Sequence, residues 1–167
     1  MQSSWESRDM KPLRDTVCDY IIHRVCAAGG ALNELKLQKL MYYVQAWNLA
    51  FNGKPLFDGR FQAWVHGPVN RELYDRFGAT KSLYSQITSD DISADFQTTL
   101  LPDEARQHID SVLETYAGFT GTQLEELTHR EEPWIAARRG YRDSERCEVE
   151  IDEELMRSFY GARLQSN

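Results

Sequence analysis

The sequence is poor in cysteine and has no long apolar run, and both shortages restrict the kind of protein it can encode. Its three cysteines, Cys18, Cys26 and Cys147, are an odd number and form no CxxC or Cys/His pattern. We therefore expect reduced thiols and no disulfide framework. No stretch of about eighteen or more apolar residues occurs, and the N-terminus does not resemble a secretory signal peptide. These features predict a cytoplasmic protein that does not bind a membrane.

Positive charge is also scarce. The chain has 19 lysines and arginines against 26 aspartates and glutamates, a formal net charge of −7. Because this balance repels the phosphate backbone, we expect no direct binding of nucleic acid. The acid is concentrated in residues 143–154, an acidic edge that includes Glu148, Glu150 and Glu153. This edge is interpreted either as a solvated surface or as a docking surface for a basic partner.

The motifs of common enzymes are missing as well. The sequence contains no HExxH zinc motif, no GxxxxGK[ST] phosphate loop, no GxSxG nucleophile elbow and no zinc-deaminase motif pair. We expect no metal and no cofactor. An enzyme is kept as the alternative hypothesis, namely a small hydrolase that uses His66, His129 and either Glu131 or Glu132. The simpler interpretation is that both histidines are hydrogen-bonded or surface side chains.

What the sequence does contain is a strongly patterned apolar stretch over residues 35–77. Apolar side chains first recur there at spacings of three and four, which predicts a core helix that ends at Gly53. This stripe comprises Leu37, Leu40, Met41, Val44, Trp47 and Phe51. Polar residues populate the other face, so we expect the helix not to be buried around its whole circumference. These polar residues are Lys36, Lys39, Gln45 and Asn48.

The whole pattern predicts a mainly α single compact domain of about six or seven helices with one small antiparallel β element. Residues 61–65 alternate in polarity and predict a strand, closed by Gly67 and Pro68, that pairs with residues 147–151. Further helices are expected at about 13–28, 68–77, 102–117, 120–131, 132–139 and 153–164, with an irregular segment at 79–101. We place a loosely ordered N-terminal arm at 1–11 and the domain at 12–164.

Aromatic residues indicate where a partner would bind. Tyrosine and tryptophan are enriched where protein surfaces meet, although they also fill the cores of small helical domains. Five such rings lie in the patterned stretches: Tyr42, Tyr43, Trp47, Trp64 and Trp134. The side chains that we expect to contact a partner are Tyr43, Trp47, Trp64, His66, Glu148, Glu150 and Glu153.

Two motifs carry a family resemblance. The first is KLQKLMYYVQAWNLAFNGKPLFDGRFQAWVHGPVNRELYDRF and the second, at 124–138, is LEELTHREEPWIAAR. Together they resemble the Panacea domain, also called the SocA-like antitoxin domain, which is similar to the phage-associated GepA proteins. The motif positions to which we assign structural roles are Leu40, Tyr42, Gln45, Gly67, Pro68, His129, Arg130, Glu131, Pro133 and Trp134.

The resemblance implies an antitoxin that neutralises a cognate protein toxin by direct binding. Some members of this family resemble proteolytic adaptors that hand the toxin to a ClpXP-type protease, so the resemblance also implies that second mode. A phage-associated interaction protein with another target is a further alternative. Whether the chain forms a homo-oligomer is left open.

Overall fold

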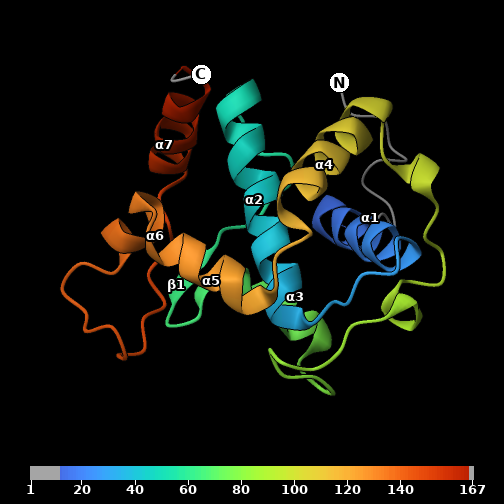
Figure 1. Ribbon diagram of the computed structural model, residues 1–167, viewed down its shortest axis with the longest axis horizontal. Coiled ribbons are helices and arrows are strands. Elements are labelled where there is room, and N and C mark those ends of the chain that lie inside the picture. The colour runs from blue at the N-terminus through green and yellow to red at the C-terminus, as the bar shows by residue number, and fades with distance from the viewer. Residues whose placement is uncertain (1–11, 166–167) are drawn as a thin grey trace.

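The structure is a computed structural model, and it describes residues 12–165. Within that range the chain forms seven α-helices and one two-stranded antiparallel sheet (Figure 1). The elements are α1 (Leu13–Ala27), α2 (Glu34–Asn52), β1 (Gln62–Trp64), β2 (Gly67–Val69), α3 (Arg71–Phe77), α4 (Asp103–Tyr116), α5 (Gly121–His129), α6 (Glu132–Ala137) and α7 (Glu153–Gln165). The predicted mainly α single domain with a small β element is confirmed. The predicted arm at 1–11 lies outside the described residues.

Helix α2 runs through the centre of the molecule and is the predicted core helix. It contacts α1, α3, α4, α5, α7 and β2, and Figure 1 shows α7 on one side of it and α1 and α4 on the other. Asn33 caps its start by accepting a hydrogen bond from the Lys36 backbone at 2.8 Å. Gly53 ends it in the left-handed conformation. The local sequence signals at Asn33 and Gly53 therefore predict both ends of this helix.

The apolar stripe of α2 is buried, but its last turn is not. Leu40 and Val44 are fully buried, and Phe77 of α3 joins the same core. Trp47 is half-buried and Phe51 is 59% exposed, so the stripe reaches the surface towards the C-terminal end of the helix.

The prediction of a polar, partly exposed face on α2 is wrong. All four polar residues assigned to that face are buried, namely Lys36, Lys39, Gln45 and Asn48. Their partners include backbone carbonyls outside the helix. Lys39 Nζ donates to the Pro68 carbonyl at 3.0 Å, and Gln45 Nε2 donates to the Phe57 carbonyl at 2.7 Å. These side chains thus satisfy buried backbone groups and fasten the loop and hairpin to the core helix.

The predicted strand at 61–65 exists in a shorter form, and its main partner differs from the prediction. β1 pairs with β2 in an antiparallel hairpin that aligns Gln62 with Val69 and Trp64 with Gly67. Gly67 and Pro68 therefore belong to the second strand and do not open a helix. Helix α3 begins later, where the Asn70 side chain accepts a hydrogen bond from the helix backbone.

Residues 147–151 do reach the other edge of β1, as predicted, but without forming a strand. The Ala63 amide donates to the Val149 carbonyl at 2.8 Å, and the Ile151 amide donates to the Phe61 carbonyl at 2.7 Å. Only an isolated bridge results. Both edges of β1 are consequently covered by the chain itself.

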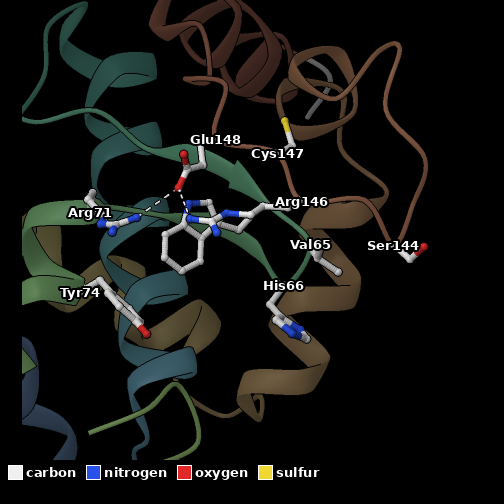
Figure 2. A pocket seen from close by; sticks show the side chains of 9 residues that line it. Val65, His66, Arg71, Tyr74, Ser144, Arg146, Cys147 and Glu148 are labelled. Carbon is white, nitrogen blue, oxygen red and sulfur yellow. Dashed lines mark hydrogen bonds and ion pairs between the residues drawn. The ribbon is translucent and has the colours of Figure 1, made fainter. Parts of the chain in front are cut away.

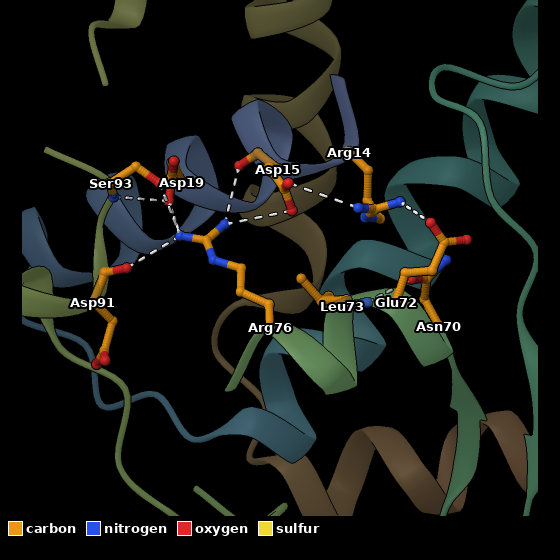
Figure 3. Close-up of polar contacts among 9 residues, drawn as sticks. All are labelled: Arg14, Asp15, Asp19, Asn70, Glu72, Leu73, Arg76, Asp91 and Ser93. Carbon is orange, nitrogen blue, oxygen red and sulfur yellow. Dashed lines mark hydrogen bonds and ion pairs between the residues drawn. The ribbon is translucent and has the colours of Figure 1, made fainter. Parts of the chain in front are cut away.

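Helix α3 is anchored to α1 by two arginines. Arg76 of α3 forms hydrogen bonds with the Asp19 carboxylate and, at 3.1 Å, with the Asp91 carbonyl (Figure 3). Arg14 of α1 donates to Glu72 of α3 at 2.7 Å. This attachment fixes a helix of only seven residues, which would not be stable in isolation.

The later helices follow the local signals in the sequence. Thr120 and Gln123 form a reciprocal capping box at the start of α5, and Asp152 accepts a hydrogen bond from the Glu154 amide at 2.9 Å at the start of α7. The irregular segment 79–101 contains two short 3₁₀ helices, Ser89–Asp91 and Thr98–Leu100. Among residues 12–165, no helix has the length and apolar character needed to cross a membrane.

Candidate partner-binding site

The two sequence motifs meet at the β1–β2 hairpin. Trp134 Nε1 of α6 donates to the Trp64 carbonyl at 2.9 Å, and the buried Arg138 donates to the Ala63 carbonyl at 2.8 Å. Two side chains of the second motif therefore hold two consecutive backbone positions of the hairpin. This contact explains why the Thr-His-Arg-Glu-Glu-Pro-Trp segment accompanies the first motif.

The start of β2 packs tightly against α2 and α5. Gly67 has a φ of +97°, and a Cβ atom there would lie 2.6 Å from Lys39 Cε and 2.9 Å from Thr128 Oγ1. Only glycine combines this conformation with so close an approach. Burial lowers the pKa of Lys39 to about 7, although Glu125 and Glu34 act in the opposite direction. The close packing against Lys39 and Thr128 therefore explains why the His-Gly-Pro motif has a glycine at position 67.

Glu131 lies in a buried tyrosine cluster. Its Oε1 accepts hydrogen bonds from the Tyr43 hydroxyl at 2.7 Å and from the Tyr160 hydroxyl at 2.8 Å. Burial raises the pKa of Glu131, and the two tyrosines and Arg163 oppose that shift. Tyr43 is fully buried in this cluster and therefore offers no exposed surface to a partner. Tyr42 is likewise buried, whereas the half-buried Trp47 donates to the Tyr116 hydroxyl.

A pocket of about 510 Å³ lies beside the hairpin (Figure 2). Three segments line it: the hairpin, α3, and the connection between α6 and α7. The side chains of interest are Trp64, His66, Arg71, Tyr74, Arg146 and Glu148. The Trp64 ring meets Tyr74 edge-on with centroids 5.1 Å apart, and the Arg71 guanidinium lies 5.6 Å from the centroid of Trp64. The pocket therefore joins aromatic surface with positive charge.

The pocket brings together three of the residues that the sequence singled out, Trp64, His66 and Glu148. Sequence reasoning missed Arg71, Tyr74 and Arg146. Arg71 and Tyr74 are exposed and half-buried positions on α3, and Arg146 lies in an exposed connection, so no periodic pattern marks them. Only the tertiary fold places them around Trp64.

The acidic edge is extensively paired with arginines. Glu148 Oε1 lies 3.2 Å from Arg71 and 2.8 Å from Arg146, and the hydrogen bond from Arg146 is the main reason why the pKa of Glu148 is lowered. Arg60 lies 3.8 Å from Glu150 and 2.8 Å from Glu153. The edge thus carries less uncompensated negative charge than its sequence suggests.

The residues of the hydrolase alternative have separate sets of contacts. Glu131 belongs to the tyrosine cluster, and the Glu132 carboxylate pairs with Arg139. The half-buried His129 stacks on Trp134 with centroids 4.0 Å apart, and burial lowers its pKa. His66 lines the pocket, and its Nδ1 lies 3.2 Å from Oε1 of Glu125, a carboxylate that the sequence did not single out. Within residues 12–165, no group of three or more His, Cys, Asp or Glu side chains could hold a metal ion.

Comparison with known proteins places these features in a family. Residues 37–135, more than half of the chain, match the family described as "Antitoxin SocA-like, Panacea domain". The chain is also similar to Antitoxin SocA of Caulobacter vibrioides (strain NA1000 / CB15N), with 28% identity over 124 residues. That alignment covers 71% of this chain and 66% of the relative, slightly less than two thirds of its length. No solved structure matches the chain.

Proposed function

Because this chain belongs to the SocA-like antitoxin family defined by the Panacea domain, we propose that it neutralises a protein toxin by binding it directly. The observation that supports this proposal is the convergence of both family motifs on the hairpin. Side chains of the second motif hold its backbone, and the hairpin presents Trp64 and His66 to a surface pocket. A rigidly held tryptophan beside tyrosine and arginine is typical of residues that dominate protein–protein binding energy.

In this proposal the protein acts by binding alone and blocks the toxin. Delivery of the toxin to a ClpXP-type protease is a separate mode, and the lifetime of the toxin distinguishes the two. A blocked toxin persists in the complex, whereas a delivered toxin disappears in cells that contain the protease and accumulates in cells that lack it.

Co-expression with the product of the adjacent gene tests the proposal. We expect the adjacent product to stop growth when expressed alone, and this protein to restore growth and to co-purify with it. Trp64→Ala should weaken the complex by about 2 kcal/mol or more if Trp64 is an anchor. The matched control is Phe119→Ala, which truncates an exposed aromatic side chain in the α4–α5 loop, outside the pocket. A harmless adjacent product that never co-purifies would contradict the proposal.

A hydrolase is the second candidate function, and one contact favours it. His66 and Glu125 form a histidine–carboxylate pair, and His66 lines a concave site, an arrangement that general bases use. If this function is correct, His66→Ala and Glu125→Gln should each abolish a measured hydrolytic turnover without lowering the thermal midpoint. Unchanged turnover in both variants would exclude this pair as the catalytic one.

A further inference from the structure

We propose that the pocket beside Trp64 is a docking site for an acidic segment of the protein partner, in which a carboxylate of the partner replaces Glu148 between Arg71 and Arg146. The expected segment carries an aspartate or glutamate next to an apolar or aromatic residue. This inference rests on the toxin-binding function proposed above and specifies the chemistry that the toxin must present.

The first argument is the arrangement of the two guanidinium groups. Arg71 comes from α3 and Arg146 from the α6–α7 connection, yet both reach the same oxygen of Glu148, at 3.2 Å and 2.8 Å (Figure 2). Two converging guanidinium groups form a recognition site for a carboxylate. In the free chain, Glu148 fills that site from within the molecule.

The second argument is that Glu148 is held weakly. Its side chain is 45% exposed, and those of Arg71 and Arg146 are 45% and 82% exposed. Water screens such ion pairs, and ordering the long side chains offsets part of the attraction. A carboxylate from a partner can therefore replace Glu148 at small cost, provided that the partner also makes other contacts.

Trp64 supplies those other contacts. Its backbone carbonyl is held by Trp134, and its indole Nε1 donates to Gln62 Oε1 at 2.8 Å, so both the position and the orientation of the ring are fixed. Tyr74 borders it edge-on. A fixed aromatic surface binds an apolar or aromatic side chain without a large loss of conformational entropy.

Charge decides between an acidic and a basic partner segment. The chain as a whole carries −7, but the charged side chains that line this pocket are Arg71, Arg146 and Glu148. Arg71 also lies 3.5 Å from Asp75, and Glu125 pairs with His66, but neither of these carboxylates lines the pocket. Displacing Glu148 therefore leaves the pocket lining with an excess of positive charge. A basic segment would meet these arginines with the wrong sign.

Two peptides test this chemistry directly. The probes are acetyl-Gly-Gly-Glu-Phe-Gly-Gly-amide and the same peptide with Gln in place of Glu, titrated into the full-length protein while the Trp64 indole signal is followed by NMR. We expect the Glu peptide to shift that signal and to bind about tenfold more tightly than the Gln peptide, as expected for a charge-assisted hydrogen bond. Equal affinity for the two peptides, or no binding by either, would overturn the inference.

Variants of the pocket sharpen the test because the inference fixes the sign of each effect. Glu148→Gln removes the internal competitor and should strengthen binding of the Glu peptide by about threefold to fivefold. The double variant Arg71→Gln, Arg146→Gln should weaken it to the level of the Gln peptide.

The matched controls are Glu154→Gln and Arg157→Gln, which disrupt another exposed pair near the start of α7 and should leave binding unchanged. Weaker binding of the Glu peptide by the Glu148→Gln variant would show that Glu148 supports binding and does not compete with the peptide, which overturns the inference.

The same variants in the growth assay separate this inference from the proposed function. If the wild-type chain neutralises a toxin and the double arginine variant does so equally well, the docking inference fails and the antitoxin proposal stands. If the chain neutralises no toxin but the peptides and variants behave as described, the antitoxin proposal fails and the carboxylate site stands.

Discussion

At the scale of single residues, Gly67 makes the closest backbone approach in the site. A methyl group there would overlap Lys39 and Thr128, and the φ of +97° adds backbone strain. We expect Gly67→Ala to lower the free energy of unfolding by about 2 kcal/mol or more. Gly118→Ala is the control, because no atom lies within 4 Å of its added Cβ. Urea titration of both variants measures the difference, and equal stability would refute the packing argument.

Glu34 makes a pH-dependent contribution to stability. It is fully buried at the first position of α2, and neither carboxylate oxygen has a hydrogen-bond partner. Burial raises its pKa from 4.5 to about 7, although Lys39 and Lys81 oppose the shift. Between these two pH values the folded chain binds a proton that the unfolded chain has released. The contribution of Glu34 to stability is therefore present at low pH and is lost as the pH rises from 4.5 to 7.

We accordingly expect Glu34→Gln to become progressively more stable than the wild type over that pH range. The gain should reach about 2 kcal/mol near neutral pH, since each unit of pKa shift corresponds to about 1.4 kcal/mol and some of it is lost to relaxation. Urea unfolding at several pH values measures the gain. Glu114→Gln on the exposed face of α4 should show no such trend. A pH-independent difference for Glu34→Gln would contradict the assignment.

At the scale of secondary-structure elements, the core helix depends on the side chains that it buries. Leu40 is fully buried in the centre of α2, so Leu40→Ala should lower the free energy of unfolding by about 2 to 5 kcal/mol, through lost apolar contact and a residual cavity. Leu100→Ala removes the same atoms from a side chain that is 55% exposed and should change stability by less than about 0.5 kcal/mol. An unchanged thermal midpoint for Leu40→Ala would refute the core assignment.

The elements also show how far the sequence determines the fold. Local signals suffice for α2 and α5, because Asn33, Gly53 and Thr120 act on the backbone next to them. They do not suffice for α3, because Pro68 belongs to β2 and the helix begins after Asn70. The polar face of α2 was misjudged because Lys39 and Gln45 bind carbonyls that are far away in sequence. The sequence does not predict strand β2, because its three residues include a glycine and a proline and show no alternation of apolar and polar side chains.

The sequence alone identifies only some residues of the candidate site, because the others are brought together by contacts between segments that are distant in sequence. Trp64 and His66 stand out as residue types in a motif, and Glu148 stands out in an acidic stretch. Arg71 and Arg146 become significant only when they converge on Glu148. That convergence depends partly on the hydrogen bonds of the α6–α7 connection with β1, which the alternation in residues 147–151 predicts. It also depends on the attachment of α3 to α1, which has no local sequence signature.

At the scale of the whole molecule, one helix connects most of the elements. Because α2 contacts α1, α3, α4, α5, α7 and β2, no part of the described chain forms a core without it. We expect a single cooperative unfolding transition in urea, with the same midpoint by far-UV circular dichroism and by tryptophan fluorescence. Trp64 and Trp134 report on the site and Trp47 on the core helix, while circular dichroism reports on all the helices. A fluorescence transition at a clearly lower urea concentration would show that the site unfolds separately.

The contact of Gly67 with Lys39 and Thr128 has a consequence for evolution within the family. Three elements, β2, α2 and α5, meet at one point where the Cε atom of Lys39 and the hydroxyl of Thr128 leave no room for a side chain. A relative that acquires a side chain at the position of Gly67 must first lose volume at the other two positions. Substitutions at these three sites should therefore be correlated across homologous sequences, although they are separated by 28 and 61 residues in the chain.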